Sequence, residues 1–159
     1  MMNIAASVKD LSVSQSSFYL IKEFNKCLSN TDLSMSVFFE RPAIPPIQTC
    51  FACKSVSFLS SYQGVVIATS LEAADQALKA SNSSSRYLYM WDLEWLETPM
   101  YFDAAMRILR DERLKIIARS SSHAQLIEEF CNKKPVGIVS DWDMREIQKL
   151  IGDEHEKHR

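Results

Sequence analysis

The chain has 159 residues, enough for one ordinary domain and too few for two that each bury a full hydrophobic core. Hydrophobic residues make up 47% of it and charged residues 24%, a composition typical of globular proteins and not of disordered ones. The 18 Lys and Arg against 20 Asp and Glu leave no basic excess to neutralise phosphates, which argues against nucleic-acid binding.

Hydrophobic segments in the chain are short. None approaches the ~20 apolar residues that a membrane-spanning helix needs, and residues 1–11 lack the basic start and apolar centre of a secretory signal. We therefore expect a soluble cytoplasmic protein that makes no contact with membranes. In that reducing compartment the four cysteines are expected to be free thiols.

Residues 1–64 carry the weaker structural signals. The spacing of apolar residues predicts a helix over residues 16–28, and residues 36–40 have the composition of a short strand. Another strand is expected within residues 51–62. Three prolines interrupt regular structure between these strands: Pro42, Pro45 and Pro46. The sequence thus predicts a less regular N-terminal extension, residues 1–64, with a helix and a proline-containing loop.

Cys50 and Cys53 form a C-x-x-C pair, a spacing found in zinc sites and in redox-active proteins. A tetrahedral zinc site needs two further ligands, and Cys27 and Cys131 stand alone on predicted helices. A thioredoxin-like pair follows a strand and opens a helix, whereas this pair follows a proline-containing loop. We therefore expect no bound metal, no redox role and no cofactor.

From Val65 onwards, apolar segments alternate with segments of helical period, a pattern typical of parallel strands joined by crossover helices. Four strands are predicted, at residues 65–68, 86–93, 114–118 and 136–139. The sequence therefore predicts an α/β domain over residues 65–152, a Rossmann-like sheet of four or more mostly parallel strands with helices on both faces. A frayed charged tail is expected at residues 153–159.

Helix starts are predicted from capping signals. Ser70 precedes a helix over about residues 71–80, and Pro99 occupies the first position of the next one. Ser122 with Gln125 has the spacing of a capping box. Asp143 with Glu146 repeats that spacing before the last helix: both pairs are three residues apart.

The chain contains three glycines: Gly64, Gly137 and Gly152. Neither G-x-G-x-x-G nor a P-loop can be assembled from them, and both motifs need glycines where the backbone approaches phosphate. Dinucleotide oxidoreductases and P-loop NTPases are thereby disfavoured. The three histidines have no nucleophile at a recognisable spacing, so no catalytic residue is assigned and enzymatic activity stays open.

In open α/β sheets, ligands bind beyond the carboxyl ends of the strands. Six residues at predicted strand ends form the candidate ligand-binding set: Ser70, Asp92, Glu94, Arg119, Ser121 and Ser122. Arg119 beside serines at a helix start suits a phosphate or a carboxylate. In the structural alternative, Ser122 only caps its helix and Arg119 pairs with Asp141 or Asp92.

Asp92 and Glu94 lie two residues apart on a segment predicted to be extended, which would place both carboxylates on one face. There they would act as a general base or bind sugar hydroxyls; in the alternative they are a solvated strand exit. The nearby aromatic residues are expected mainly in the core, not as a base-stacking platform: Tyr87, Tyr89, Trp91, Trp95 and Tyr101.

Four segments resemble small uncharacterised proteins of tailed bacteriophages, which in turn look like one Rossmann-type half of a GT-B glycosyltransferase. The segments are YLYMWDLEW (87–95), LKIIARS (114–120), HAQLI (123–127) and VGIVSD (136–141). The resemblance covers residues 65–151 and implies a pocket for a nucleotide sugar. Because a complete enzyme of that type binds its donor between two such domains, the resemblance implies that activity would need a dimer or a partner.

Two functional hypotheses remain. The preferred one is a non-catalytic interaction or accessory protein, phage-encoded and active in the host cytoplasm, that contacts a protein partner or a second copy through its aromatic and proline-rich N-terminal part. The alternative is a glycosyltransferase-like domain that binds a nucleotide sugar or another phosphorylated ligand through the candidate set. In that case Ser70, Arg119 and the two serines hold the phosphate while the two carboxylates face the sugar.

Overall fold

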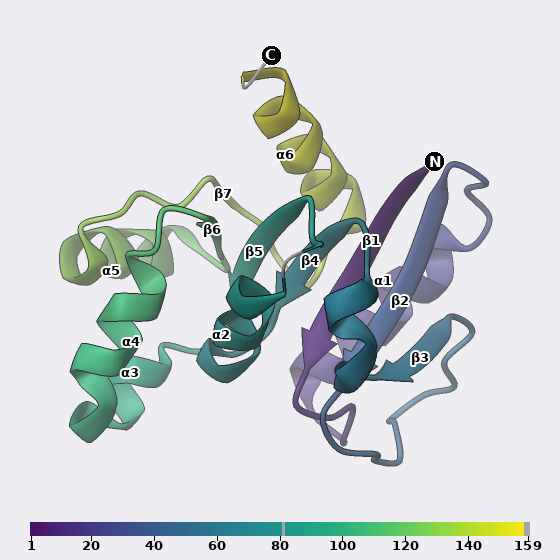
Figure 1. Ribbon diagram of the computed structural model, residues 1–159, viewed down its shortest axis with the longest axis horizontal. Helices are drawn as coiled ribbons and strands as arrows, with labels where there is room; N and C mark the ends of the chain where they lie inside the picture. The colour runs from purple at the N-terminus through teal and green to yellow at the C-terminus, as the bar shows by residue number, and fades with distance from the viewer. Residues whose placement is uncertain (81, 158–159) are drawn as a thin grey trace.

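The computed structural model describes residues 1–80 and 82–157, and these form one sheet of seven parallel strands covered by helices. The strand order is β3-β2-β1-β4-β5-β6-β7 (Figure 1). The expected α/β, Rossmann-like fold with a mostly parallel sheet is therefore confirmed. The strands are β1 (Met2–Val8), β2 (Leu33–Phe39), β3 (Ala52–Ser55), β4 (Val65–Ala68), β5 (Ser85–Met90), β6 (Leu114–Ala118) and β7 (Gly137–Ile138).

Helices cover both faces of the sheet, as expected. The α-helices are α1 (Gln15–Cys27), α2 (Leu71–Lys79), α3 (Glu94–Glu97), α4 (Phe102–Leu109), α5 (Ser121–Cys131) and α6 (Met144–Lys157), and the 3₁₀ helices are η1 (Val56–Ser61) and η2 (Pro99–Tyr101). The buried side chains of α1 and α6 share one apolar core with the sheet. Those of α2, α4 and α5 share the core on the opposite face (Figure 1).

The structure corrects the expectation for residues 1–64. They are not a less regular extension beside the sheet, because they supply β1, β2 and β3 of the same sheet. The boundary expected at residue 65 falls at β4, which pairs with β1 in parallel. β1 is central and its residues Ile4 to Ser7 are fully buried. β1 has few local sequence signals because Ala5, Ala6 and Ser7 have weak intrinsic strand preference.

Several predicted boundaries differ from the observed ones. β5 ends at Met90 and not at residue 93, since the chain bends after Trp91 and begins α3 at Glu94. The charged segment expected to fray from residue 153 continues α6 as far as Lys157, while residues 158 and 159 lie outside the described part. The cap predicted at Asp143 is confirmed: its carboxylate accepts hydrogen bonds from two backbone N–H groups of α6.

Within residues 1–80 and 82–157, no helix combines the length and the apolar character needed to cross a membrane. The longest one described, α6, has 14 residues and carries charged side chains along its length.

Candidate binding site at the carboxyl edge of the sheet

The strand order reverses direction between β1 and β4, the two neighbours at the centre of the sheet. From this point α1 leaves toward one face and α2 toward the other, so their first turns flank the carboxyl ends of the two strands (Figure 1). Ligands of open α/β folds bind at such a switch point. Ser14 caps α1 through Ser17 N (3.0 Å), and Ser70 caps α2 through Ala73 N (3.1 Å).

The start of α2 is occupied by a carboxylate of the chain itself. The backbone N–H of Leu71 lies 3.1 Å from Glu94 Oε1 and 3.3 Å from Oε2. Glu94 opens α3 instead of extending β5, so the predicted alternation of Asp92 and Glu94 on one extended face is wrong. Asp92 is exposed, whereas the Glu94 carboxylate is turned inward toward the helix.

The turn that leads from β1 to α1 also contains a carboxylate. Asp10 Oδ1 accepts a hydrogen bond from the backbone N–H of Ser12 at 2.9 Å, and the Ser12 hydroxyl donates to the same oxygen. These bonds, together with the positive charges of Lys9 and Arg41, hold the pKa of Asp10 below its usual value. Ionised Asp10 therefore places negative charge where this fold class commonly receives a phosphate.

Three further carboxylates surround Glu94 and disfavour its charge. Burial is the largest cause of its raised pKa; the hydrogen bond from Leu71 opposes it, and the charges of Asp92, Glu97 and Glu72 add to it. A group whose pKa is higher in the folded than in the unfolded chain destabilises the fold once it ionises. Stability is then regained as the pH falls through the folded-state pKa.

Replacing Glu94 with Gln is expected to raise the melting temperature at about pH 7, because Gln keeps an oxygen for Leu71 N–H and removes the buried charge. Near pH 4, where the wild-type carboxyl is largely protonated, the two proteins should melt at similar temperatures. Thermal denaturation followed by circular dichroism across this range measures the effect. A lower melting temperature of Glu94→Gln at every pH would mean that the charge-assisted bond to Leu71 outweighs burial and repulsion.

Arg119 stacks on an aromatic side chain at the end of β6. Its guanidinium carbon lies 3.9 Å from the centroid of the Trp91 ring, and Trp91 in turn lies 6.2 Å from the Tyr19 ring of α1. We call Tyr19, Trp91 and Arg119 the aromatic shelf. In the part of the chain that the structure describes, no Asp or Glu forms an ion pair with Arg119, so the pairing with Asp141 or Asp92 is not observed.

Of the three serines that follow Arg119, one caps α5 and the other two are exposed. Ser120 and not Ser122 caps α5, since its hydroxyl accepts a hydrogen bond from His123 N at 3.2 Å. Ser121 and Ser122 are exposed, and the Ser122 hydroxyl lies 3.0 Å from that of Ser120. The predicted capping box therefore starts two residues too late.

The six candidate residues form two groups and not one pocket. Ser70, Asp92 and Glu94 belong to the start of α2 and the turn after β5, whereas Arg119 and the two exposed serines follow β6. β4 and β6 are separated by β5, so their ends are about 10 Å apart. A ligand that contacts both groups would have to span the end of β5, where Trp91 lies.

Comparison with known proteins does not narrow the function. No family model, no curated protein and no solved structure matches this chain. The seven-stranded parallel sheet establishes the fold class, but such folds carry many unrelated functions. Function must therefore be inferred from the sites themselves.

A loop that the sequence did not single out closes this edge after β7. Asp141 and Trp142 both have positive φ values, 49° and 60°, which non-glycine residues adopt rarely. Trp142 is fully buried, with its ring centroid 4.7 Å from that of Tyr89. The Tyr89 hydroxyl donates to Val139 O at 2.7 Å. The only hint in the sequence was a large aromatic residue directly before the Asp143 cap.

An open groove of about 730 Å³ runs between α1 and α6 and reaches the aromatic shelf at Tyr19. Charges of both signs line it, including Lys22, Arg145 and Asp141. Lys22 Nζ lies 5.9 Å from the centroid of the Tyr19 ring. The groove extends the polar surface of the carboxyl edge without adding a preference for one sign of charge.

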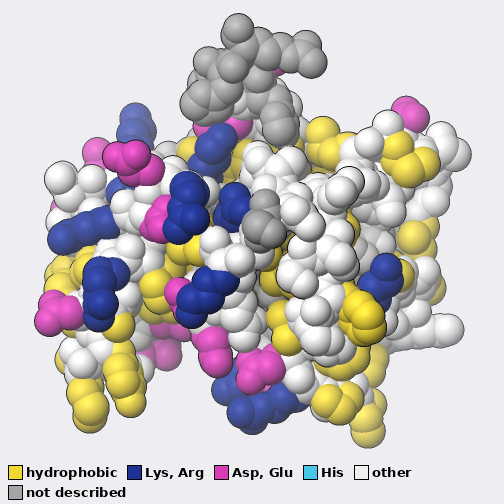
Figure 2. All heavy atoms as spheres, viewed as in Figure 1, with side chains coloured by type: hydrophobic (Ala, Val, Ile, Leu, Met, Phe, Trp, Pro, Cys, Tyr) yellow, Lys and Arg dark blue, Asp and Glu magenta, His cyan; other side chains and the backbone are white. Residues whose placement is uncertain are grey.

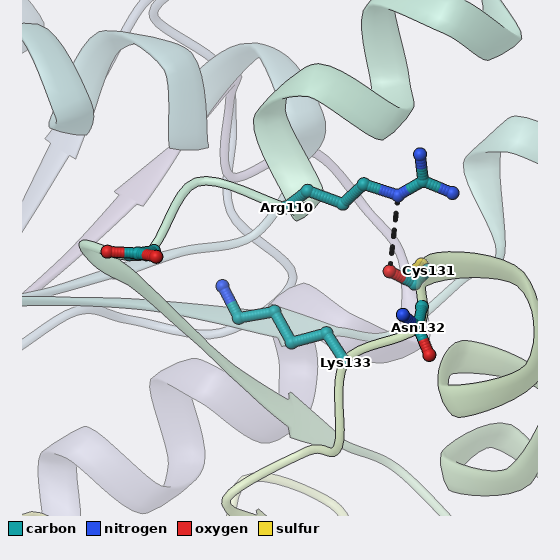
Figure 3. A pocket seen from close by; sticks show the side chains of 5 residues that line it. Arg110, Cys131, Asn132 and Lys133 are labelled. Atoms are coloured by element: carbon teal, nitrogen blue, oxygen red, sulfur yellow. Dashed lines mark hydrogen bonds between the residues drawn. The ribbon is translucent and has the colours of Figure 1, made fainter.

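A second concavity, of about 410 Å³, lies between the ends of α4 and α5, at the opposite edge of the sheet (Figure 3). Lys133 Nζ donates to the backbone oxygens of Leu109 (3.1 Å), Asp111 (2.6 Å) and Leu114. Arg110 Nε donates to the backbone oxygen of Cys131 at 3.2 Å. Lys133 thus joins the end of α4 to β6, and Arg110 joins the ends of α4 and α5, so we interpret this concavity as structural.

Cys50 and Cys53 are exposed, Cys50 before β3 and Cys53 within it. Partial burial raises the pKa of the Cys53 thiol, whereas a reactive cysteine needs a lowered one. Among the described residues, no group of three or more His, Cys, Asp or Glu side chains is arranged to hold a metal ion.

Proposed function

We propose that this chain is a non-catalytic interaction or accessory protein built on a Rossmann-like domain. The observation that carries the proposal is the pair of carboxylates at the switch point: Asp10 in the turn before α1, and Glu94 of α3, which accepts a hydrogen bond from the first turn of α2. An anionic ligand at this point would have to displace Glu94 and approach Asp10 against charge repulsion. The carboxyl edge is thus better suited to hold the fold together than to receive a phosphate.

Exposed apolar side chains support an interaction role. Met100, Tyr101 and Leu96 are 85%, 62% and 47% exposed on the segment that joins β5 to α4. Ile44, in the proline-containing loop after β2, is 86% exposed. Apolar groups gathered on protruding segments are a common property of protein-interaction surfaces. The partner is a protein or a second copy, and phage origin, implied by the sequence resemblance, is part of the proposal.

One observation favours a second candidate function, the binding of a nucleotide sugar or another phosphorylated ligand. Arg119 has its charge on the aromatic shelf without a carboxylate partner among the described residues, and Ser121 and Ser122 are exposed beside it. When a guanidinium stacks on an aromatic ring, its N–H groups still point outward in the plane of the guanidinium and can bind an anion.

A thermal-shift experiment separates the two functions. A ligand at about 100 times its dissociation constant stabilises a fold by about 2.7 kcal/mol, or about 5 °C or more for a chain of this size. For a non-catalytic interaction protein we expect no shift with UDP-sugars, GDP-sugars or inorganic phosphate. A reproducible shift that the Arg119→Ala variant abolishes would replace the interaction proposal by the second function.

Arg119→Ala also has an expected effect without any ligand. Because Arg119 stacks on Trp91 and forms no ion pair with a carboxylate of the described residues, its removal should lower the free energy of unfolding by about 0.5–2 kcal/mol, as for a cation–π contact. Urea denaturation measures this. A loss of about 3–5 kcal/mol would instead indicate a buried ion pair that the variant breaks.

A further inference from the structure

We propose that the segment after β5 is a docking site for a basic protein partner that has an apolar socket rimmed by Lys and Arg. We call residues 92–103 the acidic knob; they comprise the end of the β5 turn, α3, η2 and the first residues of α4. This inference rests on the proposed interaction function and adds the surface and the chemistry of the partner.

The knob exposes apolar side chains although the core is close by. Trp95 is only 2% exposed and packs 6.3 Å from the Phe130 ring, which fixes one side of the segment to the protein. Leu96, Met100 and Tyr101 point outward from the same segment. Figure 2 shows hydrophobic side chains gathered at the lower left, over α3 and the start of α4. The exposed apolar surface is therefore held in place on a buried anchor.

The charge of the knob has one sign. No Lys or Arg occurs between Arg86 and Arg107, while the same stretch contains four carboxylates: Asp92, Glu94, Glu97 and Asp103. Glu72 of α2 faces the same cluster, and the repulsion contributes to the raised pKa of Glu94. The apolar tip of the knob, Met100 and Tyr101, therefore lies in a stretch of chain whose charged residues are all acidic.

This charge selects the class of partner. Nucleic acids and anionic lipid surfaces carry negative charge and would be repelled. A protein surface with an apolar socket and basic rim would bury Met100 and Tyr101 while its Lys and Arg approach Glu97 and Asp103. Aromatic and Met side chains are enriched at the centres of such interfaces, with charged groups at the rim.

The knob is preorganised for binding. Pro99 restricts the backbone at the start of η2, and three backbone hydrogen bonds close its turns: Leu96 N to Leu93 O, Thr98 N to Glu94 O and Tyr101 N to Thr98 O. A segment that is already ordered loses little conformational entropy when it docks. The apolar tip can therefore bind without first folding.

The inference is tested with an amphipathic helical peptide built only of Lys and Leu, labelled with a fluorophore and titrated with the protein. Two matched peptides replace Lys by Glu, or Leu by Ser. We expect the Lys/Leu peptide to bind at least about tenfold more tightly than either control in fluorescence anisotropy, because only it is both basic and apolar. Equal binding of all three peptides, or none by the Lys/Leu peptide, would overturn the inference.

Two double variants test whether the peptide binds at the knob. Met100→Ser with Tyr101→Ser removes the apolar tip, and Glu97→Lys with Asp103→Lys reverses the rim charge. Each is expected to weaken Lys/Leu binding about tenfold or more, while the matched control Ile138→Ser, at an exposed apolar residue of β7, changes it less than about twofold. Because the substituted knob side chains other than Asp103 lie in short exposed turns, melting temperatures of the knob variants should stay near wild type.

The outcomes keep the two proposals apart. If peptide binding is unchanged in both knob variants, or is weakened most by Ile138→Ser, the acidic knob is contradicted but the interaction function still stands. A nucleotide-sugar shift that depends on Arg119 contradicts the interaction function itself, whatever the peptide does.

Discussion

Replacing Trp142 with Ala is expected to lower the free energy of unfolding by about 3–5 kcal/mol, a large part of the stability of a domain of this size. The Trp142 ring is fully buried and makes edge contacts with Tyr89 of β5 (4.7 Å) and Phe24 of α1 (6.1 Å). Its indole nitrogen donates to the Ser16 hydroxyl at 3.4 Å. The Trp142 side chain thus connects the loop between β7 and α6 to β5 and α1. Its loss leaves a cavity between these elements.

Urea denaturation monitored by circular dichroism measures this loss. Trp142→Phe, which keeps an aromatic ring and loses the bond to Ser16, should cost less than the alanine variant. The matched control Phe58→Ala removes a ring that is 60% exposed on η1 and should change stability much less. A cost below about 1 kcal/mol for Trp142→Ala would contradict the packing of this loop against α1 and β5.

The second large effect is expected at the opposite edge of the sheet. Lys133→Met should lower the free energy of unfolding by about 2–4 kcal/mol, because the ammonium group hydrogen-bonds the backbone oxygens of Leu109, Asp111 and Leu114. Methionine keeps the length of the side chain and leaves these acceptors, at the end of α4 and the start of β6, without their donor. Burial also lowers the pKa of Lys133, as expected for an ammonium group drawn into the protein.

Lys134 provides the matched control, since it is the next residue and is exposed. Lys134→Met removes the same charge from the same loop and is expected to change stability by less than about 0.5 kcal/mol. Urea denaturation of the two variants in parallel separates the contribution of the hydrogen bonds to stability from that of the net charge. Equal losses would show that charge, and not the capping of carbonyl oxygens, explains the role of Lys133.

Much of the fold could be predicted because its signals are local. Ser70 before α2 and Asp143 before α6 are capping residues in the structure as in the sequence. The apolar strands at 65–68 and 114–118 lie where expected, since buried parallel strands are almost wholly hydrophobic. β1 was missed because small residues fill its centre, and burial between two helical layers, not strand preference, holds it in the sheet.

The candidate site was predictable only as positions along the chain. Arg119 was placed correctly after a strand at the carboxyl edge, but its contact with Trp91 depends on the neighbouring strand and not on spacing. Glu94 was assigned to an extended segment, and its bond to Leu71 depends on a helix that starts 23 residues earlier. Local sequence patterns therefore could not show that the candidate residues form two separate groups in space.

The sequence by itself determined the class of fold, most helices and strands from β4 onwards, and the absence of glycine-rich phosphate loops. These features depend on residues a few positions apart, where periodicity and capping act. Only the tertiary structure decided that β1 is the central strand, that Glu94 closes the start of α2, and that Trp142 joins α1 to β5. The physical reason is that these contacts join segments distant in the chain, and their energies arise from burial and pairing that exist only once the sheet has formed.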